Sequence, residues 1–386
     1  MREALRVLIV DDQSSMRSML KKMLHQMGFC QSIEDAGDGE EAWGKLRAGL
    51  FDLVISDIGM PRLDGIGLLK RCRADMDLRD LPFLMISGHA LPEWVAMASE
   101  WGAYDYIVKP FSYSFLKERI ESLFERRNSP EEALFRDVER LKEDGQVEAA
   151  LDKIDEIEKT APLRIKWLNL KGECLMELGR MEEAAASIEK ALELSDAFLA
   201  AHKNYAAVQQ ELGNIEKAIE ALERADSLSP MDLDRKIALG SLLLKTGSQE
   251  EGNKFLDQVL RQSSSEDKEN YRLKVAEVYM ANKQYGHAED LYVKTVRTNP
   301  AAIEAFNRLG IALRRQGKLK EAEKYYQLAL KSHPNNAAIS YNLAVLYLQR
   351  MEKAEAAKLL KKVLEIDPNF SKAADMLRQI EGDGAR

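Results

Sequence analysis

The sequence predicts two folds in succession, an α/β domain with a doubly wound five-stranded parallel sheet and then an all-α array of repeated helix pairs. Between positions 1 and 127, short apolar runs alternate with helical patterns, as in a parallel sheet with helices on both faces. From residue 131 onward only helical patterns appear, and small residues recur at a constant spacing. The length of 386 residues fits two or more domains.

Composition narrows the classes of function. The net charge of -8 and the pI of about 5.5 disfavour nucleic acid or an anionic membrane as the main partner. No apolar run approaches the roughly 20 residues of a membrane span. The first four residues lead straight into a strand, so we expect no signal peptide, and Cys30, Cys72 and Cys174 form no metal or disulfide pattern. These features predict a cytoplasmic protein.

The first domain is predicted to alternate strands and helices. Its strands are expected at 5–10, at 31–35, up to Asp57, at 83–86 and at 104–108. Its helices are expected at 14–27, at 38–47, after Gly65, from Pro92 and at 112–127. The last helix is predicted to face the sheet with apolar residues at helical spacing, namely Phe115, Leu116, Ile120, Leu123 and Phe124.

Four of the predicted strands end in polar residues. The first ends in Asp11 and Asp12, and the others end in Asp57, Ser87 and Lys109. Parallel neighbouring strands would bring these side chains together at one edge of the sheet, where ligands bind in open α/β sheets. Three carboxylates invite a hard cation such as Mg²⁺, whereas a lysine and a hydroxyl suit phosphoryl oxygens.

Each residue has an ordinary explanation when it is taken singly. Asp11 or Asp12 could cap a helix, Ser87 could be a turn hydroxyl, and Lys109 could be a solvated surface lysine. Tyr106 could be a half-buried core residue. Their joint arrangement favours a site.

The same residues resemble the receiver domain of bacterial response regulators, a flavodoxin-like fold, over residues 1–127. The resemblance rests on a series of motifs in family order: Asp11-Asp12, Asp57, Met60-Pro61, Asp64-Gly65, Ser87 and Lys109-Pro110. It extends into the first helix, where Ser14-Ser15-Met16-Arg17 is similar to chemotaxis-type receivers.

The resemblance implies a role for each of these residues. Asp57 would be the phosphoacceptor, and Ser87 and Lys109 would contact the phosphoryl group. Ser87 and Tyr106 would be the switch residues. Mg²⁺ would be held by a set of oxygens from Asp11, Asp12, Asp57 and the Gly59 backbone carbonyl.

The junction at residues 128–130 is short. Ser129 is predicted to cap the next helix, with Pro130 at its first position and Glu132 three residues after the cap. The last helix of the first domain should therefore run almost directly into the second domain.

The second half is periodic. Gly145, Gly179, Gly213 and Gly247 are evenly spaced, and Pro300, Pro334 and Pro368 share the same spacing. It resembles tetratricopeptide repeats. Seven repeats are expected, at 131–164, 165–198, 199–232, 233–266, 269–302, 303–336 and 337–370, followed by a capping helix and tail at 371–386. Lys283 and Met351 replace the turn glycine in two repeats, so the sequence specifies those two turns less clearly.

A solenoid of this type offers a concave surface for protein segments. By the resemblance, the partner-facing positions include Leu273, Met280, Asn307, Ile311, Arg314, Arg315, Tyr341, Val345 and Leu348. This face could take an acidic or mixed peptide. Alternatively, its apolar residues are partly core and Arg314-Arg315 is a solvated pair.

The function predicted from these features is a two-component signalling adaptor. A histidine kinase or phosphotransfer protein would phosphorylate Asp57, and phosphorylation would alter binding by the repeats or self-association through the receiver. The alternative is a constitutive scaffold whose receiver localises the assembly or serves as a phosphate sink. Apart from the receiver's own phosphotransfer and slow dephosphorylation, no enzymatic activity is expected.

Overall fold

The computed structural model describes residues 5–88, 103, 105–160, 162–265 and 267–383. Contacts divide the chain into two units, Met1–Asp232 and Leu233–Arg386. Each unit is described by itself.

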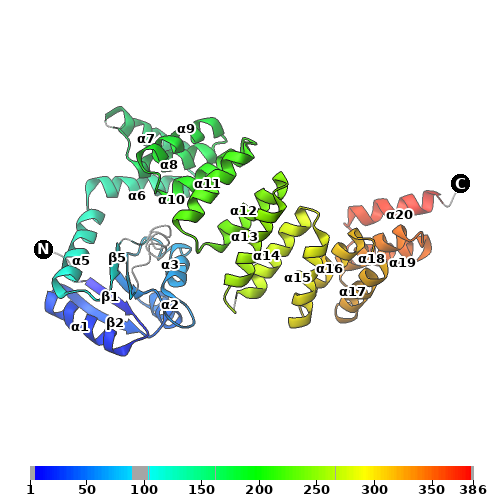
Figure 1. The fold of residues 1–386 in the computed structure, drawn as a ribbon, viewed down its shortest axis with the longest axis horizontal. Coiled ribbons are helices and arrows are strands. Elements are labelled where there is room, and N and C mark those ends of the chain that lie inside the picture. Colours follow the sequence, from blue (N-terminus) through cyan, green and yellow to red (C-terminus); the bar gives the residue numbers. More distant parts are fainter. Residues whose placement is uncertain (1–4, 89–102, 104, 161, 266, 384–386) are drawn as a thin grey trace. The chain divides into compact units, whose positions relative to one another are not determined.

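The first unit begins with a five-stranded sheet (Figure 1). Its strands are β1 (Leu5–Val10), β2 (Cys30–Ala36), β3 (Leu53–Asp57), β4 (Phe83–Ser87) and β5 (Asp105–Val108). Their order is β2-β1-β3-β4-β5, and all neighbours pair in parallel. The predicted parallel sheet is therefore confirmed, with strand ends that differ from expectation by at most one residue.

Helices cover both faces of this sheet, namely α1 (Ser14–Met27), α2 (Gly39–Ala48), α3 (Gly65–Arg73) and α5 (Tyr113–Arg127). Alternation along β1 divides its side chains between two cores. Val7 and Ile9 pack with α1 and α5, whereas Leu8 and Val10 pack with α2 and α3. The helix expected from Pro92 lies outside the described residues.

One expectation about α5 was wrong. Leu116, Ile120 and Leu123 are buried, but Phe115 is 36% exposed and lies under the guanidinium of Arg119. Adjacent helical residues point about 100° apart, so Phe115 and Leu116 do not both face the sheet.

The junction after α5 is short and ordered by hydrogen bonds. The backbone N–H groups of Asn128 and Ser129 donate to carbonyls of the last turn of α5, at 3.0 and 3.1 Å. The Ser129 hydroxyl accepts from Glu132 N at 3.2 Å, which confirms the predicted cap, and Pro130 begins the next helix. No glycine-rich tether separates the two helices.

Helix pairs follow to the end of the chain (Figure 1). The first unit ends with α6 (Pro130–Glu143), α7 (Val147–Thr160), α8 (Ile165–Glu177), α9 (Met181–Leu194), α10 (Leu199–Glu211) and α11 (Ile215–Leu228). The second unit contains α12 (Leu233–Thr246), α13 (Gln249–Gln262), α14 (Lys268–Ala281), α15 (Tyr285–Thr298), α16 (Ile303–Arg315), α17 (Leu319–Ser332), α18 (Ala337–Gln349), α19 (Lys353–Ile366) and α20 (Ser371–Asp383).

The turn within each pair uses a left-handed residue. Gly145, Gly179, Gly213, Gly247 and Gly317 have φ between 73° and 91°. Lys283 and Met351 take the same conformation, with φ of 60° and 63°. The replaced glycines therefore leave the turn geometry unchanged, at the steric cost of a Cβ atom in a left-handed backbone.

This cost gives a stability prediction. Met351→Gly should raise the free energy of unfolding by about 1 kcal/mol, because it relieves the left-handed strain and the Met351 side chain, 82% exposed, contributes little packing. Urea unfolding followed by circular dichroism measures the effect. Gly317→Ala is the matched control and should be destabilising. A lower urea midpoint for Met351→Gly would contradict the prediction.

Candidate functional site

Polar residues converge at the carboxyl edge of the sheet. Val10 pairs with Ser56, so Asp11 and Asp57 follow neighbouring strands at the same level. Ser87 pairs with Val108, which places Lys109 just beyond the end of β4. The structure thus brings together residues that lie up to 98 positions apart in the chain.

The ammonium group of Lys109 lies between two carboxylates. Its Nζ atom is 2.8 Å from Asp11 Oδ2 and 2.5 Å from Asp57 Oδ1. Asp57 Oδ2 also accepts from Gly59 N at 3.0 Å, and Asp11 Oδ1 accepts from Gln13 N at 2.8 Å. Both carboxylates are buried, with exposed fractions of 1% for Asp11 and 9% for Asp57.

Burial and charge shift the pKa values of this group. Burial raises the pKa of Asp57 and the charge of Asp11 adds to the rise, although Lys109 and the Gly59 N–H oppose it. Burial alone would lower the pKa of Lys109, but the two carboxylates raise it. Ionisation of the Asp57 carboxyl is therefore disfavoured in the folded protein, mainly by burial, even with Lys109 in place.

Removing that lysine should destabilise this part of the chain. Lys109→Met leaves two buried carboxylates without their cation, at a cost of about 3 kcal/mol near pH 7. The loss should shrink as the pH falls through the raised pKa of Asp57, because the protonated carboxyl needs no partner. Thermal unfolding between pH 4 and 8 measures it.

Mg²⁺ provides the control for this variant. It should raise the melting temperature of Lys109→Met more than that of the wild type, because it restores positive charge to the carboxylates. Equal stability of the two proteins at pH 7 would contradict the assigned contact.

The other predicted residues lie around this contact. Asp12 is exposed next to Asp11, and Ser87 is buried with an exposed fraction of 7%. Tyr106 is half-buried and packs against the core formed with α2 and α3. The predicted roles of Ser87 and Tyr106 as switch residues remain predictions.

The oxygen ligands at this edge of the sheet are of the type that a hard divalent cation prefers. They are not, however, arranged as a complete metal site. Among the residues that the structure describes, no group of three or more His, Cys, Asp or Glu side chains is arranged to hold a metal ion. Two buried carboxylates nevertheless face one another across Lys109, and Asp12 adds a third at the rim. Oxygen ligands of this kind suit Mg²⁺, and the unfavourable ionisation of Asp57 would be relieved by a cation.

Comparisons with known proteins agree with the two folds. Residues 181–379, just over half of the chain, match the family model described as Tetratricopeptide repeat protein 21 C-terminal ARM domain. Residues 138–198 match the Tetratricopeptide repeat model, and residues 7–121 match the Response regulator receiver domain model. The chain belongs to the tetratricopeptide-repeat family and carries a response-regulator receiver domain.

The similar proteins fall into two groups, one that matches the receiver and one that matches the repeats. The receiver is similar to chemotaxis protein CheY-3 of Vibrio cholerae, with 44% identity over 122 residues, which cover 32% of this chain and 93% of that protein. It is also similar to chemotaxis protein CheY of Pseudomonas aeruginosa, with 43% identity over 124 residues, which cover 32% of this chain and 99% of that protein.

The repeats are similar in fold to the crystal structure of the C-terminal part of a TPR repeat-containing protein from Cytophaga hutchinsonii. The TM-score is 0.50 at 20% identity, and the match covers 63% of this chain and 99% of that one. In the described part of the chain, no helix is both long and apolar enough to cross a membrane.

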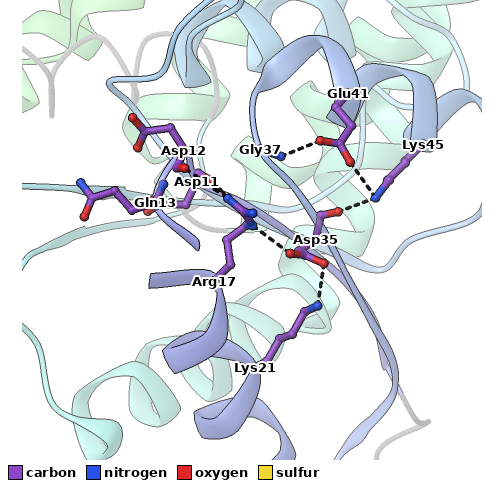
Figure 2. Close-up of polar contacts among 9 residues, drawn as sticks. All are labelled: Asp11, Asp12, Gln13, Arg17, Lys21, Asp35, Gly37, Glu41 and Lys45. Atoms are coloured by element: carbon purple, nitrogen blue, oxygen red, sulfur yellow. Dashed lines mark hydrogen bonds and ion pairs between the residues drawn. The ribbon is translucent and has the colours of Figure 1, made fainter. Parts of the chain in front are cut away.

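The receiver also contains a supporting network that the sequence did not reveal. Figure 2 shows Arg17 of α1 reaching under the loop that carries the acidic pair. Its Nη1 atom donates to the Asp11 carbonyl at 2.7 Å, and its Nε atom donates to Asp35 Oδ2 at 2.8 Å. Lys21 donates to the other Asp35 oxygen at 2.6 Å, so β2 and α1 together hold the loop after β1.

The predicted partner face of the repeats lies largely on the surface of their core. Leu273, Met280, Tyr341 and Leu348 are only partly buried and pack against core clusters. Asn307 is 7% exposed and accepts from Asn342 Nδ2 at 2.8 Å. The remaining predicted residues divide by exposure: Ile311, Arg314 and Val345 are half-buried and Arg315 is exposed. Both readings of this face, partner surface and outer core, are compatible with these positions.

Proposed function

We propose that this protein is a phosphorylation-dependent two-component signalling adaptor. A histidine kinase or phosphotransfer protein would donate a phosphoryl group to Asp57, and the modified receiver would alter protein binding by the repeats or self-association. The main support is the Lys109 ammonium between Asp11 and Asp57 at the carboxyl edge of the sheet.

The proposed transfer follows from the contacts of Asp57. One of its carboxylate oxygens forms the new O–P bond while the P–N bond to the donor histidine breaks, and the electron pair of that bond returns to the imidazole. The Gly59 N–H orients the Asp57 carboxylate. Lys109 lies close enough to exchange a carboxylate contact for a phosphoryl oxygen.

The proposed Mg²⁺ site uses Asp11, Asp12, Asp57 and the Gly59 carbonyl. When bound, the ion would supply positive charge for the phosphoryl oxygens and for the facing carboxylates. Arg17 would hold the loop that presents the acidic pair.

The proposed signal then passes from the switch residues, Ser87 and Tyr106, toward the repeats. Ser87 and Tyr106 end or lie in neighbouring strands, β4 and β5. After β5 the chain enters α5, and two hydrogen-bonded residues join α5 to α6. A change in the conformational equilibrium of the receiver would therefore act on the first repeat through a short connection.

The proposed domains are a receiver at 1–127, a linker at 128–130, seven repeats at 131–370 and a capping helix and tail at 371–386. We place this protein in the cytoplasm and assign it protein partners, without nucleic acid or membrane. Beyond its own phosphotransfer and slow dephosphorylation, we assign it no enzymatic activity.

Hydrogen exchange on the whole chain tests the proposal. The measurement compares protein with and without beryllofluoride and Mg²⁺, in which beryllofluoride stands in for the phosphoryl group on Asp57. Protection should change in 105–130 and onward into the repeats, and Asp57→Asn should show none of these changes. Changes that end before residue 128 would instead favour the constitutive scaffold, in which the receiver localises the assembly or drains phosphate.

A further inference from the structure

A groove lies between α9, α10 and α11, the last three helices of the first unit. Its volume is about 660 Å³, which is within the range of ligand sites. Leu192, Tyr205 and Ala221 line it with carbon atoms, and apart from His202 the other lining residues are charged. None of the partner-facing residues predicted for the repeats belongs to this lining.

The residue at position 205 departs from the pattern of the repeats. The residues equivalent to Tyr205 in α12, α14, α16 and α18 are buried and aliphatic, namely Leu239, Val275, Leu309 and Leu343. Tyr205 of α10 and Lys171 of α8, one repeat earlier, are polar instead. Packing between repeats favours an aliphatic residue at this position, so it does not account for either polar side chain.

The equivalent groove one repeat earlier contains its own cation. Lys171 Nζ lies 2.7 Å from Asp155 Oδ1 and 2.5 Å from Glu158 Oε2. Lys159 adds a second positive charge to the lining of that groove. Two carboxylates of α7 thus hold an ammonium group that the chain itself supplies.

The groove at Tyr205 lacks both of these cations. At the positions of Asp155, Glu158, Lys159 and Lys171 it has, in the same order, Glu189, Leu192, Glu193 and Tyr205. Tyr205 donates its hydroxyl hydrogen to Glu189 Oε1 at 2.5 Å. Burial raises the pKa of the Tyr205 hydroxyl to about 12, and Glu189 adds to the rise. The hydroxyl is therefore neutral at pH 7 and brings no positive charge to the groove.

Helix α11 does not make up the difference. Arg224 Nε donates to Asp196 Oδ2 at 2.6 Å, so this cation is already paired. Glu193, Glu220 and Lys217 form no ion pair with any residue that the structure describes. The lining as a whole contains four carboxylates and two cationic side chains. The excess of negative charge favours a cationic ligand.

An alkyl chain that ends in a positive charge matches this lining, because its carbon atoms can pack on the apolar residues while its charge meets the free carboxylates. We propose that the groove between α9, α10 and α11 binds a lysine or arginine side chain of a basic protein segment. The proposal rests on the proposed function of the repeats as a protein-binding array. It assigns to the early repeats a partner opposite in charge to the acidic or mixed peptide predicted for the late ones.

Binding is tested by titrating the full chain, at constant ionic strength, with N-acetyl-Ala-Lys-Ala-amide and with its arginine and norleucine analogues. His202 lines the groove, and the chain contains 5 histidines, so its Cε1–Hε1 NMR signal can be assigned by its absence from His202→Gln. The signal should shift and saturate with the lysine and arginine peptides. It should stay in place with the norleucine peptide, which has the same stem without the charge.

Four variants locate the site of binding. Glu193→Gln and Glu220→Gln should each weaken binding of the lysine peptide by about two- to fivefold, because each removes one attracting charge. Tyr205→Phe should strengthen it, because the Glu189 carboxylate is released from the tyrosine hydroxyl. Tyr205→Lys should abolish the shift, because the chain then supplies its own ammonium group, as Lys171 does in the preceding groove.

Glu216→Gln is the matched control for the two glutamate variants. Glu216 lies in the first turn of α11, and its loss changes the net charge by the same amount, but it does not line the groove. This variant should bind the lysine peptide as the wild type does.

Three outcomes would overturn the proposal: an unmoved His202 signal, an equal shift with the norleucine peptide, and equal weakening by Glu216→Gln. Tighter binding of N-acetyl-Ala-Glu-Ala-amide than of the lysine peptide would overturn the sign of the ligand. Tighter binding of n-butylamine than of the lysine peptide would overturn the assignment to a protein segment and give the groove to free amines. None of these results depends on Asp57, so failure here leaves the phosphorylation proposal untouched.

Discussion

Asp57→Asn is expected to abolish phosphorylation of the chain by acetyl phosphate. An amide oxygen is a far poorer nucleophile than a carboxylate, and the variant keeps the size of the side chain and its place beside Gly59. Intact-protein mass spectrometry measures the phosphate. Asp52→Asn is the matched control, because Asp52 stands at the opposite end of β3, where it accepts from Arg6 N at 2.8 Å. Undiminished phosphate on Asp57→Asn would contradict the assignment of the phosphoacceptor.

The same variant should not unfold the receiver. The pKa of Asp57 is raised in the folded protein, mainly by burial. Protonated Asp57 therefore stabilises the folded protein at a pH below the pKa of this carboxyl in the unfolded chain. This stabilisation is lost as the pH rises through the pKa of Asp57 in the folded protein. Asp57→Asn removes this loss, so its free energy of unfolding should fall less between pH 4 and 7 than that of the wild type. Urea unfolding across that range measures the difference, and a steeper fall in the variant would contradict the assigned shift.

Gly65→Ala is expected to destabilise the receiver by about 3 kcal/mol and to impair phosphorylation as well. A Cβ atom at Gly65 would lie 2.1 Å from the Asp57 carbonyl oxygen and 3.0 Å from the Asp57 carbonyl carbon. The obstacle is backbone in a central strand, fixed by pairing with β4 and by the bond from Gly65 N to Ile58 O at 3.0 Å. To relieve the overlap, either α3 or the backbone at Asp57 must move.

Gly44→Ala is the control for this variant. Gly44 lies within α2, and apart from its two neighbours and the backbone of the helix itself, no atom lies within 4 Å of a Cβ built there. Alanine should stabilise that helix by roughly 0.5–1 kcal/mol. Differential scanning calorimetry and acetyl-phosphate labelling of both variants give the two readouts. Equal stability of Gly65→Ala and wild type would show that α3 adjusts freely.

The convergence of the site could be predicted because it depends on topology. Parallel strands place their carboxyl ends at one edge, so polar residues after four apolar runs were sufficient to select Asp11, Asp57 and Lys109. The direct position of Lys109 between two carboxylates could not be predicted, because it depends on strand order and on side-chain reach. The contact of Arg17 with Asp35 was missed for the same reason, since it joins a helix to β2.

In the helical repeats, too, some features could be predicted from the sequence and others could not. The repeat period revealed which residues are equivalent, and it also marked Lys283 and Met351 as irregular. It could not show that both adopt the left-handed turn, because this depends on how the packed helices constrain the backbone. The groove beside Tyr205 was equally invisible, since it is recognised only by comparison with the Lys171 contact.

Lys109 follows the outermost strand of the sheet, and this position has a consequence for how the receiver opens. β5 pairs with β4 alone, and the last link is the bond from Lys109 N to Ser87 O at 2.7 Å. Terminal strands are the first to detach in local opening, because fewer hydrogen bonds hold them. Detachment of β5 would withdraw one positive charge and leave Asp11 and Asp57 facing each other. Divalent cations should then bind the partly open receiver more tightly than the closed one, and should raise the population of molecules in which β5 is detached.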